Sequence, residues 1–457
     1  MIAMRLSETA RLLNTSYQGA DVEFHGVSTD TRKLQANNLF IALHGPHFDA
    51  HDFIAQAQAQ GAAAALLSKP VAASLPSLCV DDTRLALGQL ASAWRQRFTL
   101  PVVAVTGSNG KTTVKEMIAA IFNQSGPVLV TQGNLNNDIG LPLTLLGLQA
   151  EHRFAVIEMG ANHAGEIAYL TKITRPNVAV ITNVGPAHLE GFGSLEGVAH
   201  AKGEIFQGLA EHGTAIINSD DRFATTWDKA IGNRHCLHFG LETQADVSAR
   251  WTPNATGSAL HLHTPQGKID VALHLIGKHN VMNALAASAA ALAAGATLTQ
   301  IKSGLEAMQP VTGRLQSKAG LHGTRIIDDT YNANPASVQA ALQVLANYPS
   351  PRWLVLGDMG ELGPDSAVLH EQVGTQARAA QVERVFAVGK LSQGAVDTFG
   401  GGAQHFGSQD QLITALQTAL GEIDTASPTI LVKGSRAAHM EHIVAALAPT
   451  TTAVGGH

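Results

Sequence analysis

Short, mostly apolar runs alternate with amphipathic stretches through the middle of the chain. The runs at 102–105, 127–130, 154–158, 178–182 and 215–218 predict buried strands, and the segments between several of them have helical spacing. Strands that alternate with helices are typical of a mostly parallel, doubly wound sheet. The pattern therefore predicts a central α/β unit.

The same alternation occurs on both sides of this unit. Before it, a helix is expected at 6–13 and buried strands at 38–43 and 62–67, which indicates a small α/β domain. After it, apolar runs that begin near 325, 353, 384 and 428 predict a second open α/β sheet. With 457 residues, we expect three domains, at 1–83, 84–312 and 313–457.

Two stretches of the central unit depart from this alternation of strands and helices. Residues 247–271 form short alternating segments broken by Pro253, Gly257 and Pro265, which predict a small antiparallel excursion. Residues 280–294 form an Ala-rich helix closed by Gly295.

Composition restricts the classes of function. Apolar residues make up 45% and charged residues 14%, which indicates a packed globular protein. The net charge of −6, without a long charge run, argues against a nucleic-acid partner or an anionic membrane surface. Two cysteines, Cys79 and Cys236, make a disulfide framework or cysteine zinc site improbable and fit a reducing compartment.

Targeting segments are not expected from the sequence. Residues 1–14 carry Arg5, Glu8 and Arg11 in an amphipathic helical pattern and lack the apolar centre of a secretory signal. The long apolar windows are Ala-rich and predict packed helices, so we expect no membrane span and a cytoplasmic location.

The strongest chemical signal is the stretch 106–113, which has the sequence TGSNGKTT between a predicted strand and a predicted helix. Glycines let backbone N–H groups approach phosphates, and the helix N-terminus adds partial positive charge. Lys111 would reach the β- and γ-phosphates, and the Thr112 hydroxyl would bind Mg²⁺. Val105 stands where the longer pattern has glycine, so the loop is a shorter variant; a turn with a coincidental GKT is the alternative.

Three further side chains follow strands of the same predicted sheet. Glu158 ends the run 154–158, where a carboxylate beside a phosphate loop suits Mg²⁺, although it could instead cap a loop. His188 follows another strand; a lone histidine is more often a hydrogen-bonded loop residue than a ligand. Lys202 lies on a predicted helix, where a solvated lysine is the usual outcome.

Together these pieces resemble the Mur ligase family, most closely the member that adds D-alanyl-D-alanine. The likeness covers essentially the whole chain and rests on motifs at 106–113, 133–142, 158–160, 183–188, 201–204, 277–284, 313–314, 328–335, 356–363 and 433–436. It implies a small N-terminal α/β domain, a central P-loop doubly wound ATPase domain and a C-terminal Rossmann-like α/β domain.

The resemblance implies an ATP-dependent ligase. ATP would phosphorylate the terminal carboxylate of UDP-N-acetylmuramoyl-tripeptide, and the D-alanyl-D-alanine amine would then displace phosphate. Positioning and charge neutralisation dominate such phosphoryl transfers. The implied cofactors are ATP and Mg²⁺, and the implied state is a monomer.

The resemblance also assigns residues. The implied catalytic residues are Lys111, Glu158, His188 and Lys202, with Thr112 and Glu158 on one Mg²⁺ and His188 on a second with Lys202, which the family carries as a carbamate. The implied nucleotide contacts are Gly107, Ser108, Asn109, Gly110, Lys111, Thr112, Thr113, Asn280, Asn283, Arg314 and Asp329. The implied substrate contacts are Ser28, Thr31 and Arg32 for the uridine diphosphate, Asn134, Asn136 and Asn137 for the muramyl end, and Tyr331, Asn332 and Asn334.

Because the implied ATP contacts are divided between the second and third domains, we expect the domains to close on substrates, with a hinge at Gly313. One departure from the family pattern is Ala50 in place of glycine, which affects the first-domain loop and not the ATPase residues.

Three rival interpretations remain open from the sequence. One is another ligase of the same fold, such as a folylpolyglutamate synthase or a neighbouring member of the Mur ligase family. Another is a P-loop switch or motor, although no guanine-reading Asn-Lys-x-Asp motif is present. The third is a non-catalytic nucleotide-sugar binder. The third residue of the tripeptide, diaminopimelate or lysine, also stays open.

Overall fold

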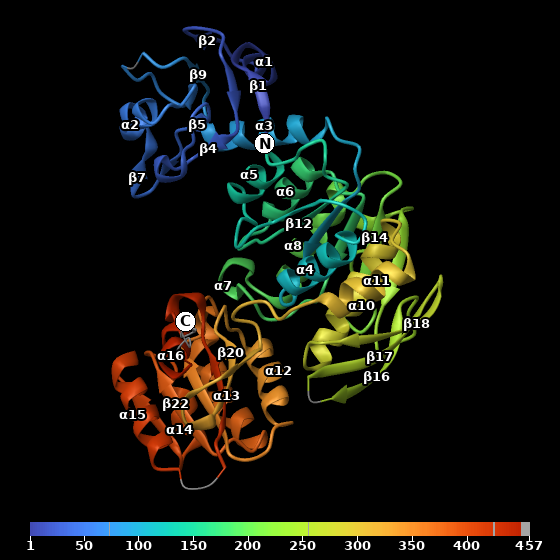
Figure 1. The fold of residues 1–457 in the computed structure, drawn as a ribbon, viewed down its shortest axis with the longest axis vertical. Helices are drawn as coiled ribbons and strands as arrows, with labels where there is room; N and C mark the ends of the chain where they lie inside the picture. Colours follow the sequence, from blue (N-terminus) through green and yellow to red (C-terminus); the bar gives the residue numbers. More distant parts are fainter. Residues whose placement is uncertain (73, 255, 424–425, 449–457) are drawn as a thin grey trace, which may run out of the picture.

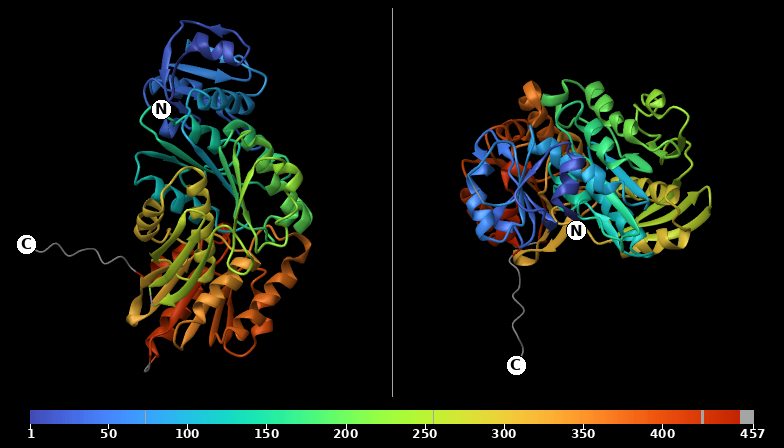
Figure 2. Two further views of the ribbon diagram at one scale, coloured as in Figure 1. Left: turned by 90° about the vertical axis from the view of Figure 1, so that its right-hand side faces the viewer. Right: turned by 90° about the horizontal axis from the view of Figure 1, so that it is seen from above.

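The structure is a computed structural model that describes residues 1–72, 74–254, 256–423 and 426–448. Three domains follow one another along its long axis, with the N-terminal domain at one end and the C-terminal domain at the other (Figures 1 and 2). None of the helices in the described part of the chain has the length and apolar character needed to cross a bilayer.

The N-terminal domain contains a five-stranded sheet in the order β2-β9-β8-β5-β4. Its strands are β2 (Tyr17–Gln18), β4 (Val27–Ser28), β5 (Leu39–Ile41), β8 (Ala64–Leu67) and β9 (Ser77–Cys79). The other elements are β1 (Ala3–Arg5), paired with β3 (Glu23–His25), β6 (His44–Gly45), paired with β7 (Phe48–Asp49), and the helices α1 (Leu6–Leu12) and α2 (Ile54–Ala59). Short 3₁₀ turns span Thr31–Lys33 and Ala50–Phe53.

The central domain is built on a six-stranded sheet in the order β11-β12-β10-β13-β14-β15, with every neighbouring pair parallel. Its strands are β10 (Val102–Thr106), β11 (Val128–Val130), β12 (Phe154–Glu158), β13 (Val178–Ile181), β14 (Thr214–Asn218) and β15 (His235–Phe239). The predicted doubly wound sheet is therefore confirmed. Since β10 lies between β12 and β13, the strand order reverses at its carboxyl end, which is where open α/β sheets bind ligands.

Helices cover both faces of this sheet, and a small antiparallel sheet lies beside them (Figure 1). The helices are α3 (Thr83–Arg95), α4 (Lys111–Phe122), α5 (Gly140–Leu145), α6 (Glu166–Thr174), α7 (Leu189–Phe192), α8 (Leu195–Gly203), α9 (Asp228–Ile231), α10 (Lys278–Ala293) and α11 (Leu298–Ala307), with a 3₁₀ turn at Glu204–Gly208. The antiparallel excursion is a three-stranded sheet of β16 (Ser248–Asn254), β17 (Gly257–Thr264) and β18 (Gly267–Leu273).

Alternate residues of β10 belong to two different apolar cores. Val102 and Ala104 pack in one core, whereas Val103 and Val105 pack in the other with α4, α10 and α11. The first of these cores also contains Ile2 of the N-terminal domain and Leu87 of α3. The N-terminal and central domains thus share an apolar core, with α3 as the predicted bridge between them.

The C-terminal domain has a six-stranded sheet in the order β19-β20-β24-β21-β22-β23, parallel except for the antiparallel edge strand β19. Its strands are β19 (Gln316–Ala319), β20 (Arg325–Asp329), β21 (Arg352–Gly357), β22 (Arg384–Val388), β23 (Ala403–Phe406) and β24 (Thr429–Lys433). Its helices are α12 (Pro335–Leu345), α13 (Ser366–Ala379), α14 (Gln393–Phe399), α15 (Gln409–Gly421) and α16 (Glu441–Leu447), with 3₁₀ turns at Leu321–Gly323, Gly363–Asp365 and Arg436–Ala438.

The two apolar cores of the C-terminal domain lie one on each face of its sheet, and the described residues in them all belong to this domain. The chain reaches this domain after α11, through a segment in which Gly313 has a φ of +71°. That left-handed conformation favours glycine, which fits the hinge expected there.

Candidate functional site

The phosphate-loop sequence forms the turn between β10 and α4. Gly107 has φ +150° and Gly110 has φ +81°, and a Cβ would meet Thr182 Oγ1 at 1.8 Å or Asn283 Oδ1 at 2.4 Å, respectively. Gly110 is also the N-cap of α4 and offers no side-chain cap, so the first N–H groups of the helix stay available for phosphate oxygens. The turn thus has the shape and polarity of an anion cradle.

Lys111 begins α4 and turns back over the loop. Its Nζ donates to the carbonyl oxygen of Gly107 at 2.7 Å. Burial lowers the pKa of Lys111, the Arg314 guanidinium lowers it further, and the Glu158 carboxylate opposes both. An arriving phosphate would restore the preference for the charged ammonium, so this site favours a negatively charged ligand.

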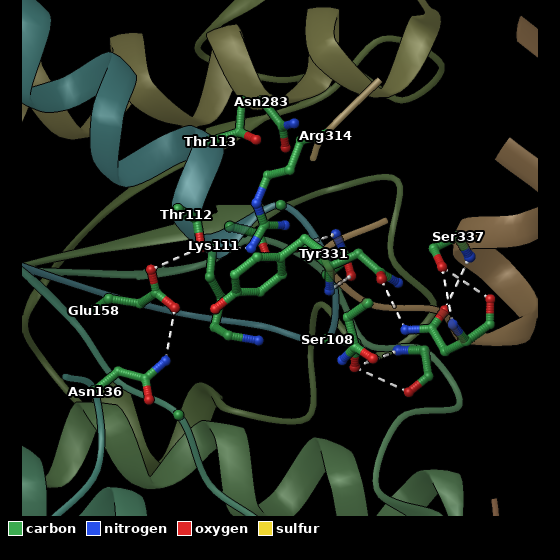
Figure 3. Close-up of a pocket in the computed structure, with 18 of the residues that line it drawn as sticks. Ser108, Lys111, Thr112, Thr113, Asn136, Glu158, Asn283, Arg314, Tyr331 and Ser337 are labelled. Carbon is green, nitrogen blue, oxygen red and sulfur yellow. Dashed lines mark hydrogen bonds between the residues drawn. The ribbon is translucent and has the colours of Figure 1, made fainter. Parts of the chain in front are cut away.

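Glu158 is the buried acidic centre of the site, at 2% exposure (Figure 3). Its Oε2 accepts a hydrogen bond from Thr112 Oγ1 at 2.9 Å, and its Oε1 accepts one from Asn136 Nδ2 at 2.8 Å. Thr112 Oγ1 in turn accepts from Nη2 of Arg314 at 2.8 Å, which joins the C-terminal domain to the central one.

These oxygens suit Mg²⁺. A threonine hydroxyl beside a carboxylate supplies two hard ligands, and Mg²⁺ usually completes its shell with water and phosphate oxygens. In the described residues, no group of three or more His, Cys, Asp or Glu side chains could hold a metal by itself.

His188 and Lys202 lie near this centre but in different surroundings. His188 lines the cavity, and its Nδ1 is 2.5 Å from Oε2 of Glu361, an ion-pair contact that does not meet hydrogen-bond geometry. Burial lowers the pKa of His188, and Glu361 opposes the shift. Lys202 is 2% exposed, does not line the cavity, and holds its Nζ 5.8 Å from the ring centroid of Phe192.

The pKa of Lys202 is well below its ordinary value. Burial is the main cause, Lys111 adds to it, and Glu204 opposes it. Among the described residues, no carboxylate lies within 4.0 Å of its Nζ. The amine is therefore held where its neutral form is favoured.

The nucleotide end of the cavity combines α10 with the start of the C-terminal domain. Asn283 Nδ2 donates to Asn280 Oδ1 at 3.2 Å, and both asparagines are buried. Arg314 places its Cζ 4.2 Å from the ring centroid of Tyr331 (Figure 3), and its buried Nε has no hydrogen-bond partner among the described residues. A buried donor without a partner is costly, so the geometry suits an incoming acceptor such as a phosphate oxygen.

Two cavity-lining residues at this end were not predicted as site residues, His279 and Lys433. Lys433 Nζ pairs with Asp329 and also donates to the carbonyl oxygen of Asn332 at 3.0 Å. Burial lowers the pKa of His279 to about 4, with Asp329 opposing the shift. His279 lies in the motif at 277–284, next to Asn280, and Lys433 lies in the motif at 433–436, at the end of a predicted strand. These two positions are the sequence signal that could have identified them as site residues.

The cavity has a volume of about 800 Å³ and lies between the central and C-terminal domains. It brings together most of the predicted residues, namely Ser108, Asn109, Gly110, Lys111, Thr112, Thr113, Asn134, Asn136, Asn137, Glu158, His188, Asn280, Asn283, Arg314, Asp329, Tyr331, Asn332 and Asn334. Asn334 also joins the two domains, because its Nδ2 donates to Asn109 Oδ1 at 2.9 Å.

Some predicted residues lie elsewhere. Ser28, Thr31 and Arg32 belong to the N-terminal domain and do not line this cavity; Arg32 pairs with Asp30, and Ser28 Oγ donates to the Asp30 carbonyl. Gly107 acts through its backbone, and Lys202 lies behind the lining. Asn137 lines the cavity but also accepts from Gly140 N at 2.8 Å, which fixes the start of α5.

Comparisons with known proteins find relatives that match along most of the chain. The chain matches three family models, described as Mur ligase family, catalytic domain (residues 23–95), Mur ligase middle domain (105–291) and Mur ligase, glutamate ligase domain (313–436). It is 50% identical to the UDP-N-acetylmuramoyl-tripeptide--D-alanyl-D-alanine ligase of Escherichia coli K12 over 98% of this chain and 99% of that protein.

Two solved structures are also similar. One is the UDP-N-acetylmuramoylalanyl-D-glutamyl-2,6-diaminopimelate--D-alanyl-D-alanyl ligase of Acinetobacter baumannii, with a TM-score of 0.89, 38% identity, and coverage of 97% of this chain and 98% of that one. The other is the MurF ligase of Thermotoga maritima in complex with ADP, with a TM-score of 0.83, 28% identity, and coverage of 92% and 96%.

Proposed function

This chain belongs to the Mur ligase family, and on that premise we propose that it joins D-alanyl-D-alanine to UDP-N-acetylmuramoyl-tripeptide with ATP as phosphoryl donor. The observation that carries the proposal is the junction of Lys111, Glu158 and Arg314 in one cavity between two domains. The relatives named for this ligation match over nearly the whole chain.

The first step is transfer of the γ-phosphoryl group to the terminal carboxylate of the tripeptide, which forms an acyl phosphate and ADP. The α4 N-terminus and Lys111 hold the transferring phosphates, while Arg314 directs its free Nε toward them. Thr112 and Glu158 would hold Mg²⁺, which when bound neutralises phosphate charge. Asn280 and Asn283 hold the adenine, and Asp329 the ribose.

In the second step, the dipeptide amine attacks the acyl carbon, the resulting tetrahedral intermediate collapses, phosphate leaves and the amine releases a proton to solvent. Tyr331, Asn332 and Asn334 follow β20 at the edge of the cavity and are the side chains we assign to the incoming dipeptide. Asn134, Asn136 and Asn137 line the cavity from the central domain and are the side chains we assign to the muramyl end of the nucleotide. We assign Ser28, Thr31 and Arg32 of the N-terminal domain to the uridine diphosphate.

We further propose that Lys202 carries a carbamate. Its neutral amine would add CO₂ and release a proton, which converts an uncharged group into an anion that offers two hard oxygen ligands near His188. Together with His188, this group would hold a second Mg²⁺. The uncharged amine that the addition requires is favoured by the burial of Lys202.

The experiment is a phosphate-release assay with each co-substrate omitted in turn. A ligase releases phosphate in stoichiometric amounts with the pentapeptide product only when ATP, the nucleotide tripeptide and the dipeptide are all present. A P-loop switch would release phosphate from ATP alone, and that result would sink the proposal. We also propose a cytoplasmic monomer, to be checked by sedimentation at micromolar concentration.

A further inference from the structure

The distribution of basic side chains around the cavity is uneven. In the described part of the chain, four lysines and arginines line it: Arg84, Lys111, Arg314 and Lys433. Three of them lie at the nucleotide end, since Lys111 belongs to the phosphate loop and Arg314 and Lys433 contact Thr112 and Asp329. Arg84 is therefore the one lining cation, among the described residues, that the nucleotide does not account for.

Arg84 lies on α3, the helix that joins the N-terminal and central domains, and forms an ion pair with Asp138. The Arg84 side chain is 55% exposed and that of Asp138 is 26% exposed. Exposed pairs of this kind contribute little to stability, so stability alone gives a weak reason for their position in a cavity wall. Both side chains remain accessible to a ligand.

The pair is close to the reacting centre. Asn136 donates to Glu158, and Asp138 follows it by two residues in the same loop, so their Cα atoms are at most about 7 Å apart. Glu166, a second carboxylate, also lines the cavity. This end of the cavity therefore offers one cation and two anions beside the place where the tripeptide carboxylate is activated.

The similar ligase of Acinetobacter baumannii is named for a substrate that contains diaminopimelate. We propose that in this chain Arg84 and Asp138 recognise the free end of the third residue of the tripeptide and so select diaminopimelate over lysine. This inference rests on the proposed function. The diaminopimelate side chain ends in an ammonium and a carboxylate on one carbon, whereas the lysine side chain ends in an ammonium alone. Arg84 offers a planar donor fork to the carboxylate, and Asp138 accepts from the ammonium.

Other ligand groups fit the pair less well. The diphosphate and the glutamyl carboxylate of the substrate are anions without a cation beside them, so either would meet the negative charge of Asp138 as well as Arg84. A group with both charges replaces both partners of the existing ion pair at once. The charge pattern of the wall thus matches a zwitterion.

The test compares UDP-N-acetylmuramoyl-tripeptides that end in diaminopimelate or lysine, by kcat/KM and by calorimetric Kd. The parent should bind and use the diaminopimelate nucleotide at least about tenfold better, and Arg84→Met should lose this advantage, chiefly through KM, with the lysine nucleotide changed less than about twofold. Asp138→Asn should weaken both nucleotides by similar factors, since both carry the ammonium. Arg84→Lys keeps the charge without the fork and should retain part of the preference.

Arg222→Met is the matched control, because Arg222 pairs with Glu196 at 3.2 Å on the surface of the same domain and does not line the cavity. It should leave both nucleotides unchanged. Equal losses on both nucleotides in Arg84→Met would show that Arg84 binds a group they share, and equal Kd values in the parent would likewise overturn the inference. If the parent bound the diaminopimelate nucleotide selectively but did not ligate it to the dipeptide, the result would contradict the proposed function and leave this inference standing.

Discussion

The two junctions between the domains differ in the chemical character of their contacts. Where the N-terminal domain meets the central one, Ile2 and Leu87 share an apolar core with β10, and Ile2 N donates to the Leu146 carbonyl at 2.9 Å. Where the central domain meets the C-terminal one, three polar contacts join them: Asn334 with Asn109, Arg314 with Thr112, and Glu361 with His188.

The difference indicates which junction can move. Separating the first junction would expose a continuous apolar core to water, which costs free energy in proportion to the area exposed. Polar contacts at the second junction can be exchanged for contacts with water or ligand at little net cost. The cavity that we propose binds ATP lies at this second junction, so we expect nucleotide binding and domain closure to be coupled there.

The largest effect should come from removing charge at the polar junction. Lys111→Ala and Glu158→Ala should each lower kcat by about 10²-fold or more, since both side chains act on charge that is neutralised during phosphoryl transfer. Steady-state phosphate release measures the loss. Lys172→Ala, an exposed lysine on α6, is the control and should keep parental kcat. Full activity in either site variant, with normal thermal unfolding, would refute the assignment.

Substitutions of Lys202 test whether a residue that does not line the cavity takes part in the reaction. Lys202→Ala should lose most activity, by a factor of about 10² for an electrostatic group, and acetate should restore a fraction by supplying a carboxylate in the vacated space. Lys202→Arg should stay inactive because arginine keeps its positive charge. A Lys202→Arg variant as active as the parent would rule out the carbamate.

The two junctions should also differ in stability. Leu87→Ala should lower the free energy of unfolding by about 2–5 kcal/mol through the cavity it leaves in the shared core. Asn109→Ala removes one partly exposed side-chain contact and should cost about 1 kcal/mol. Denaturant unfolding measures both. Leu85→Ala, at an exposed position on the same helix as Leu87, should change stability by less than about 0.5 kcal/mol.

Mild acid should weaken the polar junction through His279. Because burial lowers its pKa from 6.5 to about 4, the folded protein favours the neutral ring, and the stability this provides is present above pH 6.5. It is lost as the pH falls from 6.5 toward 4, where the unfolded chain binds a proton first. His279→Gln should therefore show a shallower loss over that interval than the parent, whereas exposed His212→Gln should not.

The fold could be predicted where strands are apolar and less well where they are not. The apolar run that forms β12 predicts a strand clearly. The edge strands β15, which contains His235 and His238, and β19, which is Gln316–Ala319, are more polar. Polar edge strands have a weak hydrophobic pattern, so the sequence predicts them less well. The order of the strands in each sheet depends on long-range packing, which local patterns do not encode.

Site residues, like strands, could be predicted where a local sequence pattern contains them. Lys111, Thr112 and Glu158 could be predicted because one local motif and one strand end contain them. The pairing of Arg84 with Asp138 joins a helix to a distant loop, and no local spacing indicates it. The position of Lys202 behind the cavity lining likewise depends on how α8 packs, which the sequence of that helix alone leaves open.

The most direct test of the difference between the junctions is a pair of distances in solution. With Cys79 and Cys236 replaced by serine, spin labels at exposed Gln56 and Lys172 span the first junction, and labels at Lys172 and exposed Gln417 span the second. Addition of a non-hydrolysable ATP analogue and the nucleotide tripeptide should leave the first distance distribution unchanged and shorten and narrow the second. We predict a fixed apolar junction and a movable polar one. This prediction would be contradicted if the Lys172–Gln417 distribution stayed unchanged at saturating ligand, or if the Gln56–Lys172 distribution shifted by as much.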